Sequence, residues 1–358
     1  MKKKIDVVVP FFNPPYIGGT EEVLGRWNEY FINYKKHDVE VRFVLPFSNR
    51  KGNLFHNSPQ NISAPRLFIN SKLIKIFGGF FLFFYLLFTK SDSIVVLSPK
   101  YIRFCFNVRR IFKKNYKIIS WIHFSLSRMF VGNDDDFKKA DYHLAISTGI
   151  ARQLKGMGIA KEKIYTIYNP IDKHERVISA SLKPKFIYIG RIEREGQKNL
   201  LELIRGFSKV KRILPNATLD IYGGGRDLEF LKRDVEKRKL EDSVVFNGWN
   251  RDPWKSVSSG TALVMTSTFE GLPMTILESL SYGLPVVSSD VETGPSDEIS
   301  DKSGFLYSLG NIDQLSRKMC DAYYNKDIFE KNEIKKSISR FYTNNYFKKL
   351  VEILDQIG

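Results

Sequence analysis

Two glutamates, Glu270 and Glu278, lie eight residues apart around a Gly-Leu-Pro turn, where their carboxylates could act on a bound ligand. The apolar run 262–265 predicts a buried strand before the turn, and 274–282 predicts a helix after it. Pro273 stands where that helix would begin, a position that suits proline because the first N–H of a helix has no intrahelical partner. Ligands of open α/β sheets bind at the carboxyl ends of strands, where helix N–H groups face an anion. A carboxylate in such a place can also accept hydrogen bonds from a vicinal diol such as a ribose.

Either glutamate alone would fit a solvated acid at a helix end, stabilised by the helix dipole. The surrounding sequence, FEGLPMTILE followed by SYGLPVVSSD, is far more specific than a pair of acids. It resembles the donor-sugar site of the family 4 retaining glycosyltransferases, which have the two-domain GT-B fold. The resemblance implies that Glu270 contacts the transferred sugar and acts in catalysis, and that Glu278 binds the ribose of the nucleotide. The neighbouring residues that it places at the donor are Gly271, Leu272, Pro273, Met274 and Thr275.

Two basic residues follow the predicted strand 185–189, in the segment GRIEREGQKN. Arg191 and Lys198 bracket a turn before the predicted helix 200–214, where cations can meet a diphosphate. As ordinary surface residues they would be two of the chain's 56 Lys and Arg residues. In the family, two basic residues in this arrangement bind the donor pyrophosphate. The resemblance therefore implies binding and catalytic roles for both.

Three glycines end the predicted strand 219–222, and the first of them, Gly223, is expected at the donor. They do not form the dinucleotide-binding fingerprint, because its third glycine would fall on Leu228. In the family, the region that follows lies by the base of the nucleotide. Trp249 and Trp254 in that region fit core packing at least as well.

The first half of the chain begins with a predicted strand at 5–9 and a turn that contains Gly18 and Gly19. Thr20 is expected to cap the amphipathic helix that follows. Glycines allow close approach of a ligand to the backbone. In the family, a glycine pair here faces the donor phosphates and the acceptor across the cleft, and the alternative is an ordinary loop pair.

His123 lies near the carboxyl end of the predicted strand 118–124. A lone histidine there is either a satisfied core residue or a ligand contact. Family 4 enzymes commonly place a histidine against the transferred sugar, so the resemblance implies a catalytic role for it. The segments SWIHFSL and ADYHLAIS are more narrowly similar to the lipopolysaccharide 1,6-galactosyltransferases within the family.

The alternation of strands and helices, with the resemblance, predicts an α/β protein of the GT-B fold. We expect two Rossmann-like doubly wound parallel-sheet domains facing a central cleft. Residues 1–171 would form the acceptor-side domain and 172–184 the linker. Residues 185–338 would form the nucleotide-sugar domain, and a helix in 339–358 would cross back to the first domain.

Basic residues are concentrated in the first half of the chain. Residues 1–170 hold 27 Lys and Arg against 12 Asp and Glu, a net charge of +15, whereas the remainder holds 29 against 27, a net of +2. A cationic half predicts an acidic partner, and anionic lipid head groups attract nearby basic residues at about 1 kcal/mol each. Nucleic acid is the competing partner. No signature of a nucleic-acid-binding module is present in the sequence, so we expect the protein to bind no nucleic acid. A generally basic proteome is the third explanation.

The most apolar segment, residues 73–88, predicts a helix that is shorter than the roughly 20 residues needed to cross a bilayer. A buried helix is the first expectation, and an interfacial helix at a membrane is the alternative. The two cysteines, Cys105 and Cys320, fit no metal spacing and are expected to be reduced thiols. We interpret Asp134, Asp135 and Asp136 as a solvated loop and expect no metal or other cofactor.

The predicted function is transfer of a hexose, galactose by the narrower resemblance, from a UDP-sugar to a hydroxyl of a saccharide that is lipid-linked or on the cell surface. The protein would be peripheral at the cytoplasmic, inner face of the cell membrane. The family retains anomeric configuration, either by double displacement or by front-face attack, which we favour. The alternatives are another family 4 hexosyl- or N-acetylhexosaminyltransferase of capsule or wall polymer synthesis, a non-catalytic sugar-nucleotide-binding protein at the membrane surface, and a basic nucleic-acid-binding protein.

Overall fold

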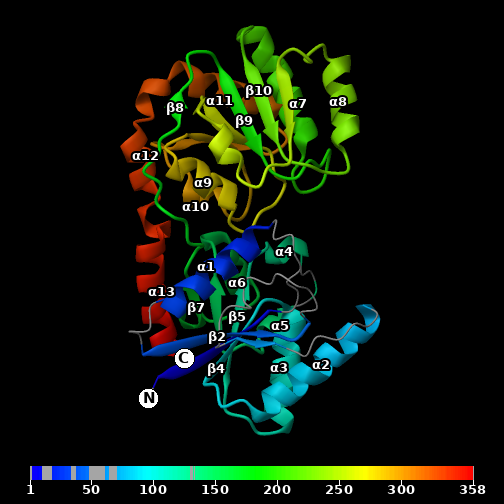
Figure 1. Cartoon of the computed structure of the whole chain (residues 1–358), viewed down its shortest axis with the longest axis vertical. Coiled ribbons are helices and arrows are strands. Elements are labelled where there is room, and N and C mark those ends of the chain that lie inside the picture. Colours follow the sequence, from blue (N-terminus) through cyan, green and yellow to red (C-terminus); the bar gives the residue numbers. More distant parts are fainter. Residues whose placement is uncertain are drawn as a thin grey trace. The chain divides into compact units, whose positions relative to one another are not determined.

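The computed structural model describes residues 2–9, 18–33, 38–47, 61–63, 71–129, 132 and 134–357. The chain forms two compact units, each built on a parallel sheet with helices around it (Figure 1). The first unit is Met1–Pro170 with Asn344–Gly358, and the second is Ile171–Thr343. The α/β architecture expected from the sequence is confirmed.

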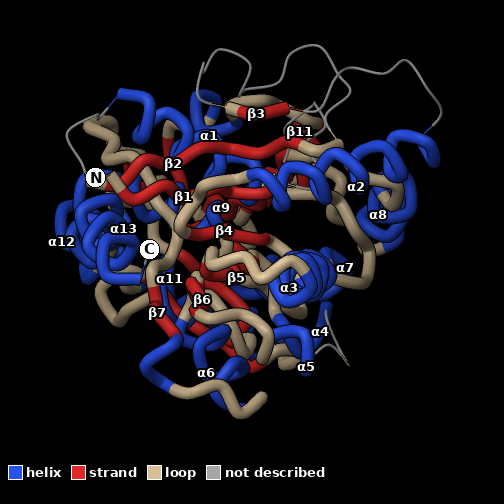
Figure 2. The backbone as a smooth tube through the Cα atoms, turned by 90° about the horizontal axis from the view of Figure 1, so that it is seen from below, coloured by secondary structure: helices blue, strands red, loops and turns tan. Residues whose placement is uncertain are grey.

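The sheet of the first unit has the strand order β3-β2-β1-β4-β5-β6-β7, and all neighbouring strands are parallel (Figure 2). Its central strands are runs of apolar residues, as expected where helices cover both faces of a parallel sheet. The strands are β1 (Lys3–Val8), β2 (Val39–Leu45), β3 (Ile62–Ser63), β4 (Ser93–Val96), β5 (Lys117–Ile122), β6 (Tyr142–Ala145) and β7 (Ile164–Thr166).

The helices of the first unit include the last one in the chain. Tyr346 of this final helix accepts a 2.9 Å hydrogen bond from Trp27 Nε1, and Phe347 stacks on Tyr30 with ring centroids 3.9 Å apart. These contacts join the final helix to the first one. The helices are α1 (Gly19–Asn33), α2 (Ser71–Phe88), α3 (Pro99–Ile111), α4 (Leu126–Met129), α5 (Asp134–Phe137), α6 (Thr148–Gly156), η1 (Lys161–Lys163) and α13 (Thr343–Ile357).

The second unit has a six-stranded parallel sheet in the order β11-β10-β9-β13-β14-β15, and a small pair, β8 with β12. Its strands are β8 (Ser179–Ala180), β9 (Lys185–Ile189), β10 (Thr218–Tyr222), β11 (Val244–Gly248), β12 (Ser259–Gly260), β13 (Ala262–Met265), β14 (Val286–Asp290) and β15 (Gly304–Ser308). Its helices are α7 (Leu200–Ile213), α8 (Leu228–Lys237), η2 (Pro253–Ser256), α9 (Met274–Ser281), α10 (Pro295–Glu298), α11 (Ile312–Tyr324), η3 (Lys326–Ile328), α12 (Lys331–Ser337) and η4 (Ser339–Phe341).

The segment 172–184, expected as a linker, lies within the second unit. Ile178 is fully buried and donates its N–H to Tyr282 O at 3.0 Å, while β8 pairs with β12. Arg176 Nη1 donates to Trp254 O at 2.7 Å. These contacts tie the segment to the second unit, so the units divide at Ile171 rather than across a free linker.

Two helix starts differ from the expectation. α1 begins at Gly19, so Thr20 lies inside its first turn rather than capping it. α9 begins at Met274, and Pro273 is the residue before it, because the ψ of 106° at Pro273 is extended rather than helical.

The three aspartates interpreted as a loop form the start of α5 instead. Asp136 is buried and pairs with Lys139 at 2.7 Å and with Arg103 at 3.3 Å, so it is not a solvated acid. Asp134 and Asp135 are exposed.

α2 is buried on one face only, so the expectation of a buried helix is correct for only half of it. Leu82 and Leu86 are almost fully buried, whereas Phe80, Phe84 and Phe88 are 58%, 53% and 77% exposed. In the described part of the chain, no helix combines the length and hydropathy needed to span a bilayer.

Candidate functional site

The strand order of the second unit reverses between β9 and β13. The chain runs from β9 to β10 and β11 on one side, and then continues as β13, β14 and β15 on the other. Ligands of open α/β sheets bind beyond the carboxyl ends of the strands at such a switch point. The loop after β9 carries Arg191 and Lys198, and the loop after β13 carries Glu270. The topology therefore brings these three expected site residues to one edge of the sheet.

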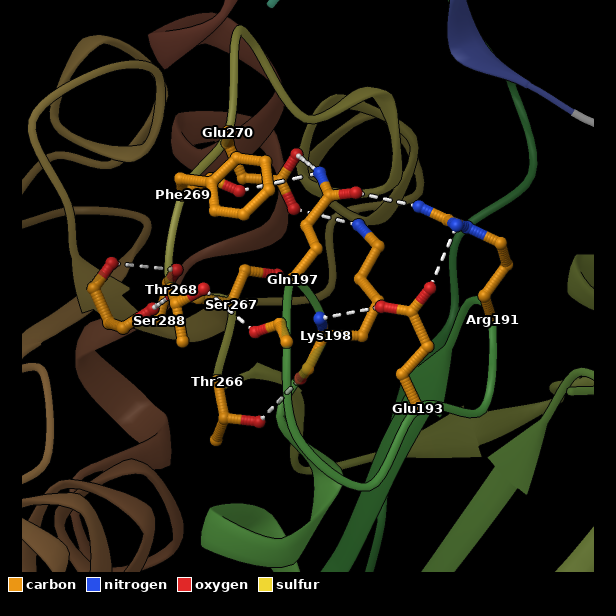
Figure 3. A network of polar contacts seen from close by, with 12 residues as sticks. Arg191, Glu193, Gln197, Lys198, Thr266, Ser267, Thr268, Phe269, Glu270 and Ser288 are labelled. Atoms are coloured by element: carbon orange, nitrogen blue, oxygen red, sulfur yellow. Dashed lines mark hydrogen bonds and ion pairs between the residues drawn. The ribbon is translucent and has the colours of Figure 1, made fainter. Parts of the chain in front are cut away.

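The Glu270 carboxylate is the centre of a polar network (Figure 3). Lys198 Nζ donates to Glu270 Oε1 at 2.7 Å, and Gln197 Nε2 donates to Glu270 Oε2 at 3.3 Å. The side chains of Lys198 and Glu270 are 14% and 8% exposed, so solvent ions screen their attraction little. Each carboxylate oxygen thus has a donor, which fixes the direction of the group. Gln197 could not be identified from the sequence, because an uncharged residue beside a motif lysine carries no pattern.

Arg191 extends the network towards solvent (Figure 3). Its Nη2 donates to Gln197 Oε1 at 2.6 Å, and its Nη1 lies 2.7 Å from Glu193 Oε1. More than half of the Arg191 side chain is exposed, so the guanidinium can reach an anion. The other oxygen of Glu193 accepts the backbone N–H of Lys198 at 3.2 Å, which holds the two ends of the loop together. Glu193 is a second network member that the sequence did not identify.

Backbone contacts join the two loops that carry these side chains. Thr268 donates its N–H to Gln197 O and its hydroxyl to Gly196 O, both at 2.8 Å. Thr266 Oγ1 donates to Asn199 O at 3.0 Å. Asn199 has a φ of +48°, and asparagine is one of the residue types that tolerate this left-handed region. The positions of Lys198 and Glu270 are therefore fixed by the same set of hydrogen bonds.

The Gly-Leu-Pro turn rests on the loop that follows β14. Thr293 donates its hydroxyl to Glu270 O, and Gly294 has a φ of +100°. A Cβ at Gly294 would lie 2.7 Å from Pro273 Cδ and 3.1 Å from Gly271 O, so a side chain there would displace the turn. Within the described residues, no protein acceptor takes the backbone N–H groups of this turn and the start of α9, at Gly271, Leu272, Met274 and Thr275. These groups can serve an anion.

Glu278 lies in α9 and is half-buried. Its Oε2 accepts a 2.7 Å hydrogen bond from Trp254 Nε1, and the ring of Trp254 packs on Tyr282 at 5.4 Å. Trp254 is buried, as expected for core packing, and it also orients the carboxylate expected to bind the ribose. Trp249, by contrast, is 58% exposed, so core packing does not describe it.

Gly223 is close to Gly190 at the end of β10. A Cβ at Gly223 would lie 1.8 Å from Gly190 O, and its φ of +149° is one that side chains rarely adopt. Its N–H donates to Gly248 O at 2.8 Å. Glycine is therefore required here, because a side chain would collide with Gly190 in the loop after β9. The N–H of Gly223 already has Gly248 O as its acceptor.

Glu298 in α10 is buried, and neither of its carboxylate oxygens has a hydrogen-bond partner in the described part of the chain. Burial raises its pKa well above the usual value, and the nearby charges of Glu270 and Asp297 raise it further. Burial and these two charges therefore favour its neutral form. The sequence did not identify it, because an acid in the first turn of a short helix is usually solvated.

The remaining expected site residues belong to the first unit. His123 follows β5 directly and is buried, and its ring edge meets Trp121 with centroids 4.5 Å apart. Burial lowers its pKa to about 3, so the imidazole is neutral at ordinary pH, and its Nε2 has no partner among the residues described. Gly19 begins α1, and Gly18 O accepts the N–H of Glu22 at 3.3 Å. The rest of that glycine turn, residues 10–17, lies outside the described residues.

The described residues contain no group of three or more His, Cys, Asp or Glu side chains placed to hold a metal ion. Cys105 and Cys320 are both buried and form no disulfide.

Comparison with known proteins gives a consistent family assignment. The family model "Glycosyl transferases group 1" matches residues 171–340, almost the whole second unit. The lipopolysaccharide 1,6-galactosyltransferase of Escherichia coli K12 is 36% identical over 245 residues, which are 66% of this chain and 67% of the relative. The same enzyme of Salmonella typhimurium LT2 is 34% identical over 268 residues, 73% of each chain.

Solved structures extend the similarity over the full chain. The apo form of the lipopolysaccharide outer core galactosyltransferase WaaB has a TM-score of 0.84 and 28% identity, and 99% of both chains is covered. Anabaena Alr3699/HepE in complex with UDP-glucose has the same fold, with a TM-score of 0.77 at 17% identity over 99% of both chains. The resemblance to family 4 is thereby confirmed, and the chain belongs to the glycosyl transferases group 1 family, as a glycosyltransferase with the GT-B fold.

Proposed function

We propose that this glycosyltransferase transfers a galactosyl group from UDP-galactose to a hydroxyl of a lipid-linked saccharide, with retention of configuration and without a metal ion. The observation that carries the proposal is the network in which Lys198 and Gln197 hold the Glu270 carboxylate at the switch point of the second sheet. The names of the similar galactosyltransferases support galactose, and the Anabaena neighbour with UDP-glucose supports a UDP-sugar.

Departure of the nucleoside diphosphate requires its negative charge to be stabilised. Arg191 is largely exposed and offers a planar fork of donors that suits phosphate oxygens. Lys198 has three N–H donors, and its contact with Glu270 uses one of them. The N–H groups at the start of α9 add a helix N-terminus. We propose that these groups together stabilise the leaving diphosphate, which is the charge-stabilising role that a metal ion fills in other transferases.

The contacts of Glu270 favour a positioning role over a nucleophilic one. Its carboxylate is held by a lysine and an amide, so its charge is already stabilised and its attack on carbon is weakened. We propose that Glu270 orients the sugar through its hydroxyls and that the acceptor attacks from the face that the diphosphate leaves. His123, with its neutral imidazole, would supply a further hydrogen bond to the sugar, as the family resemblance implies. Glu278, oriented by Trp254, would accept the ribose hydroxyls.

The acceptor side is proposed from charge and from the relatives. The basic first unit would sit on an anionic membrane, at the inner face of the cell membrane, where a lipid-linked saccharide is presented. This gives the protein a cytoplasmic, peripheral location.

The decisive experiment is a donor screen. UDP-, GDP- and ADP-hexoses and UDP-N-acetylhexosamines are incubated with the protein in EDTA, and released nucleotide is measured. We expect UDP to be released from UDP-galactose faster than any nucleotide from the other donors. Preference for an N-acetylhexosamine would replace galactose in the proposal, and inhibition by EDTA would refute the metal-free mechanism. Nucleotide binding without turnover would indicate a non-catalytic binding protein.

A further inference from the structure

α2 has a second apolar face that the first unit leaves uncovered. Leu82 and Leu86 pack into the core, while the opposite side carries five side chains that are each at least half exposed. Four of them are phenylalanines that follow the spacing of one helical stripe. The exposed side chains are Ile76, Phe77, Phe80, Phe84 and Phe88. A helix that is apolar all round is ordinarily covered on every side, by a protein core or by lipid.

The carboxyl-terminal end of α3 continues this surface. Ile111 and Phe112 are exposed there, and the Phe112 ring meets Phe83 of α2 edge to face, with centroids 5.6 Å apart. Lys114 Nζ donates to Leu87 O at 2.7 Å, which fastens the two helix ends together. In Figure 1, α2 and α3 are next to each other, and these contacts join them at the carboxyl-terminal end of α3. We call these seven exposed side chains, the five of α2 with Ile111 and Phe112, the α2–α3 patch.

The part of the sequence that carries the patch is rich in basic residues. Residues 71–117 contain ten Lys and Arg and one acid, Asp92. The ten are Lys72, Lys75, Lys90, Lys100, Arg103, Arg109, Arg110, Lys113, Lys114 and Lys117. Arg103 is paired with Asp136, and Arg109 with Asp141. Lys90, Arg110 and Lys113 are exposed and, among the described residues, pair with no acid.

We propose that the α2–α3 patch is the surface by which the protein docks on an anionic lipid bilayer. The phenylalanines would sit at the boundary of head groups and acyl chains, and Lys90, Arg110 and Lys113 would meet the lipid phosphates. This inference rests on the proposed function in taking a membrane as the site of the acceptor, and it adds the surface that makes the contact.

The charge pattern favours lipid over a second copy of the chain. A two-fold contact through the patch would place the same basic cluster on both sides of the interface, where like charges repel. The apolar character of the patch favours lipid over nucleic acid, because the exposed side chains of the patch are large and apolar. An exposed patch of large apolar side chains ordinarily marks a contact with a membrane or with another protein.

Binding to vesicles tests the proposal. We expect the full chain to co-sediment with vesicles of phosphatidylglycerol and phosphatidylcholine, and more weakly with phosphatidylcholine alone. The double substitution Phe84→Ser with Phe88→Ser should weaken binding at least about tenfold, because it removes two large apolar groups from the interface. Arg110→Gln and Lys113→Gln should each weaken it about fivefold on anionic vesicles, since a basic residue near the surface contributes about 1 kcal/mol. Ile213→Ser, which alters an equally exposed apolar residue at the end of α7, should leave binding unchanged.

The outcomes separate this inference from the proposed function. Release of UDP from UDP-galactose without vesicles should be the same in the wild type and in Phe84→Ser/Phe88→Ser, which also shows that the variant is folded. Equal vesicle binding by this variant and the wild type would overturn the docking surface while leaving the transferase intact. A wild-type dimer that this variant dissociates would reassign the patch to self-association, and binding of oligonucleotides in preference to vesicles would overturn lipid as the partner. A donor screen without turnover would refute the transferase but not the docking.

Discussion

The two units share one plan, a parallel sheet with a switch in strand order, but they use charge in opposite ways. In the second unit, the basic residues near the switch point are paired with acids, Lys198 with Glu270 and Arg191 with Glu193. In the first unit, the basic residues outnumber the acids, with a net charge of +15 over residues 1–170, and Lys90, Arg110 and Lys113 are exposed in the segments that carry the α2–α3 patch. Paired charges in a fixed network suit one small anionic ligand in one orientation. Unpaired charges beside apolar side chains suit an extended anionic surface.

This difference separates chemistry from docking. If the second unit carries out the chemistry and the first unit docks on the membrane, a substitution in the Glu270 network changes turnover without affecting membrane binding. A substitution in the α2–α3 patch does the reverse.

The largest effect is expected from Lys198→Ala. Removing a preorganised cation from a leaving diphosphate typically lowers kcat by about 100-fold or more. Lys209→Ala is the matched control, because Lys209 pairs with Asp313 on the surface of the same unit. Steady-state nucleotide release measures both variants, and circular dichroism checks that they fold. A Lys198→Ala enzyme as fast as the Lys209→Ala control would remove Lys198 from the mechanism.

Gly223→Ala tests whether this glycine serves packing rather than ligand contact. Its Cβ would overlap Gly190 O, and its φ of +149° is strained for alanine, so we expect a loss of more than about 2 kcal/mol in unfolding free energy. At Gly224 an added Cβ would meet only Trp249 Cβ at 3.7 Å, an ordinary contact, so Gly224→Ala should change stability far less. Urea unfolding of the two variants measures the difference. Equal midpoints would show that the loops accommodate a side chain at Gly223.

Acid should destabilise the first unit through His123 and His143, which are both buried. Burial lowers the pKa of His123 to about 3 and that of His143 to about 4, while an unfolded histidine titrates near 6.5. The unfolded chain therefore takes up protons first, and stability present above pH 6.5 is lost as pH falls towards 4. Each histidine should lower the free energy of unfolding by about 2 kcal/mol between pH 7 and pH 5.

His143→Asn isolates one of these contributions, because asparagine can keep a hydrogen bond to Ser120 Oγ, which lies 2.6 Å from His143 Nδ1. The variant should lose less stability than the wild type when urea unfolding is compared at pH 7 and pH 5. The same loss in both proteins would mean that His143 titrates normally in the folded unit.

Glu298 should give the second unit the opposite pH dependence. Its pKa is raised by burial, so its stabilising neutral form is fully present below the unfolded value and is lost as pH rises. Replacing it with methionine should therefore raise the free energy of unfolding, by an amount that grows as pH rises above the unfolded pKa of about 4.3. A difference that does not vary with pH would show that Glu298 is ionised in the folded unit.

Much of the fold could be predicted from apolar runs. The expected strands 185–189 and 262–265 match β9 and β13 at both ends, because a buried parallel strand is a continuous apolar run. Which side of α2 is exposed could not be predicted, although an interfacial helix was one of the two expectations. Periodicity distinguishes two faces only when one of them is polar, and in α2 both are apolar.

The candidate site was predicted less completely. The sequence identified Glu270 and Lys198 separately, but not that they form an ion pair, since 72 residues separate them and only the strand order brings them together. Gln197 and Glu298 carry no motif, and their roles arise from contacts and burial. Gly223 was expected to contact the donor. In the structure it packs closely against Gly190, and its N–H donates to Gly248 O.

Glu270→Gln is the sharpest test of whether the Glu270 network performs the transfer. The variant keeps the shape of the side chain and removes its charge. We expect UDP release from UDP-galactose to fall at least about 100-fold while UDP itself still binds, because the nucleotide is held by other residues. Turnover equal to that of the wild type would contradict the account and remove Glu270 from the chemistry.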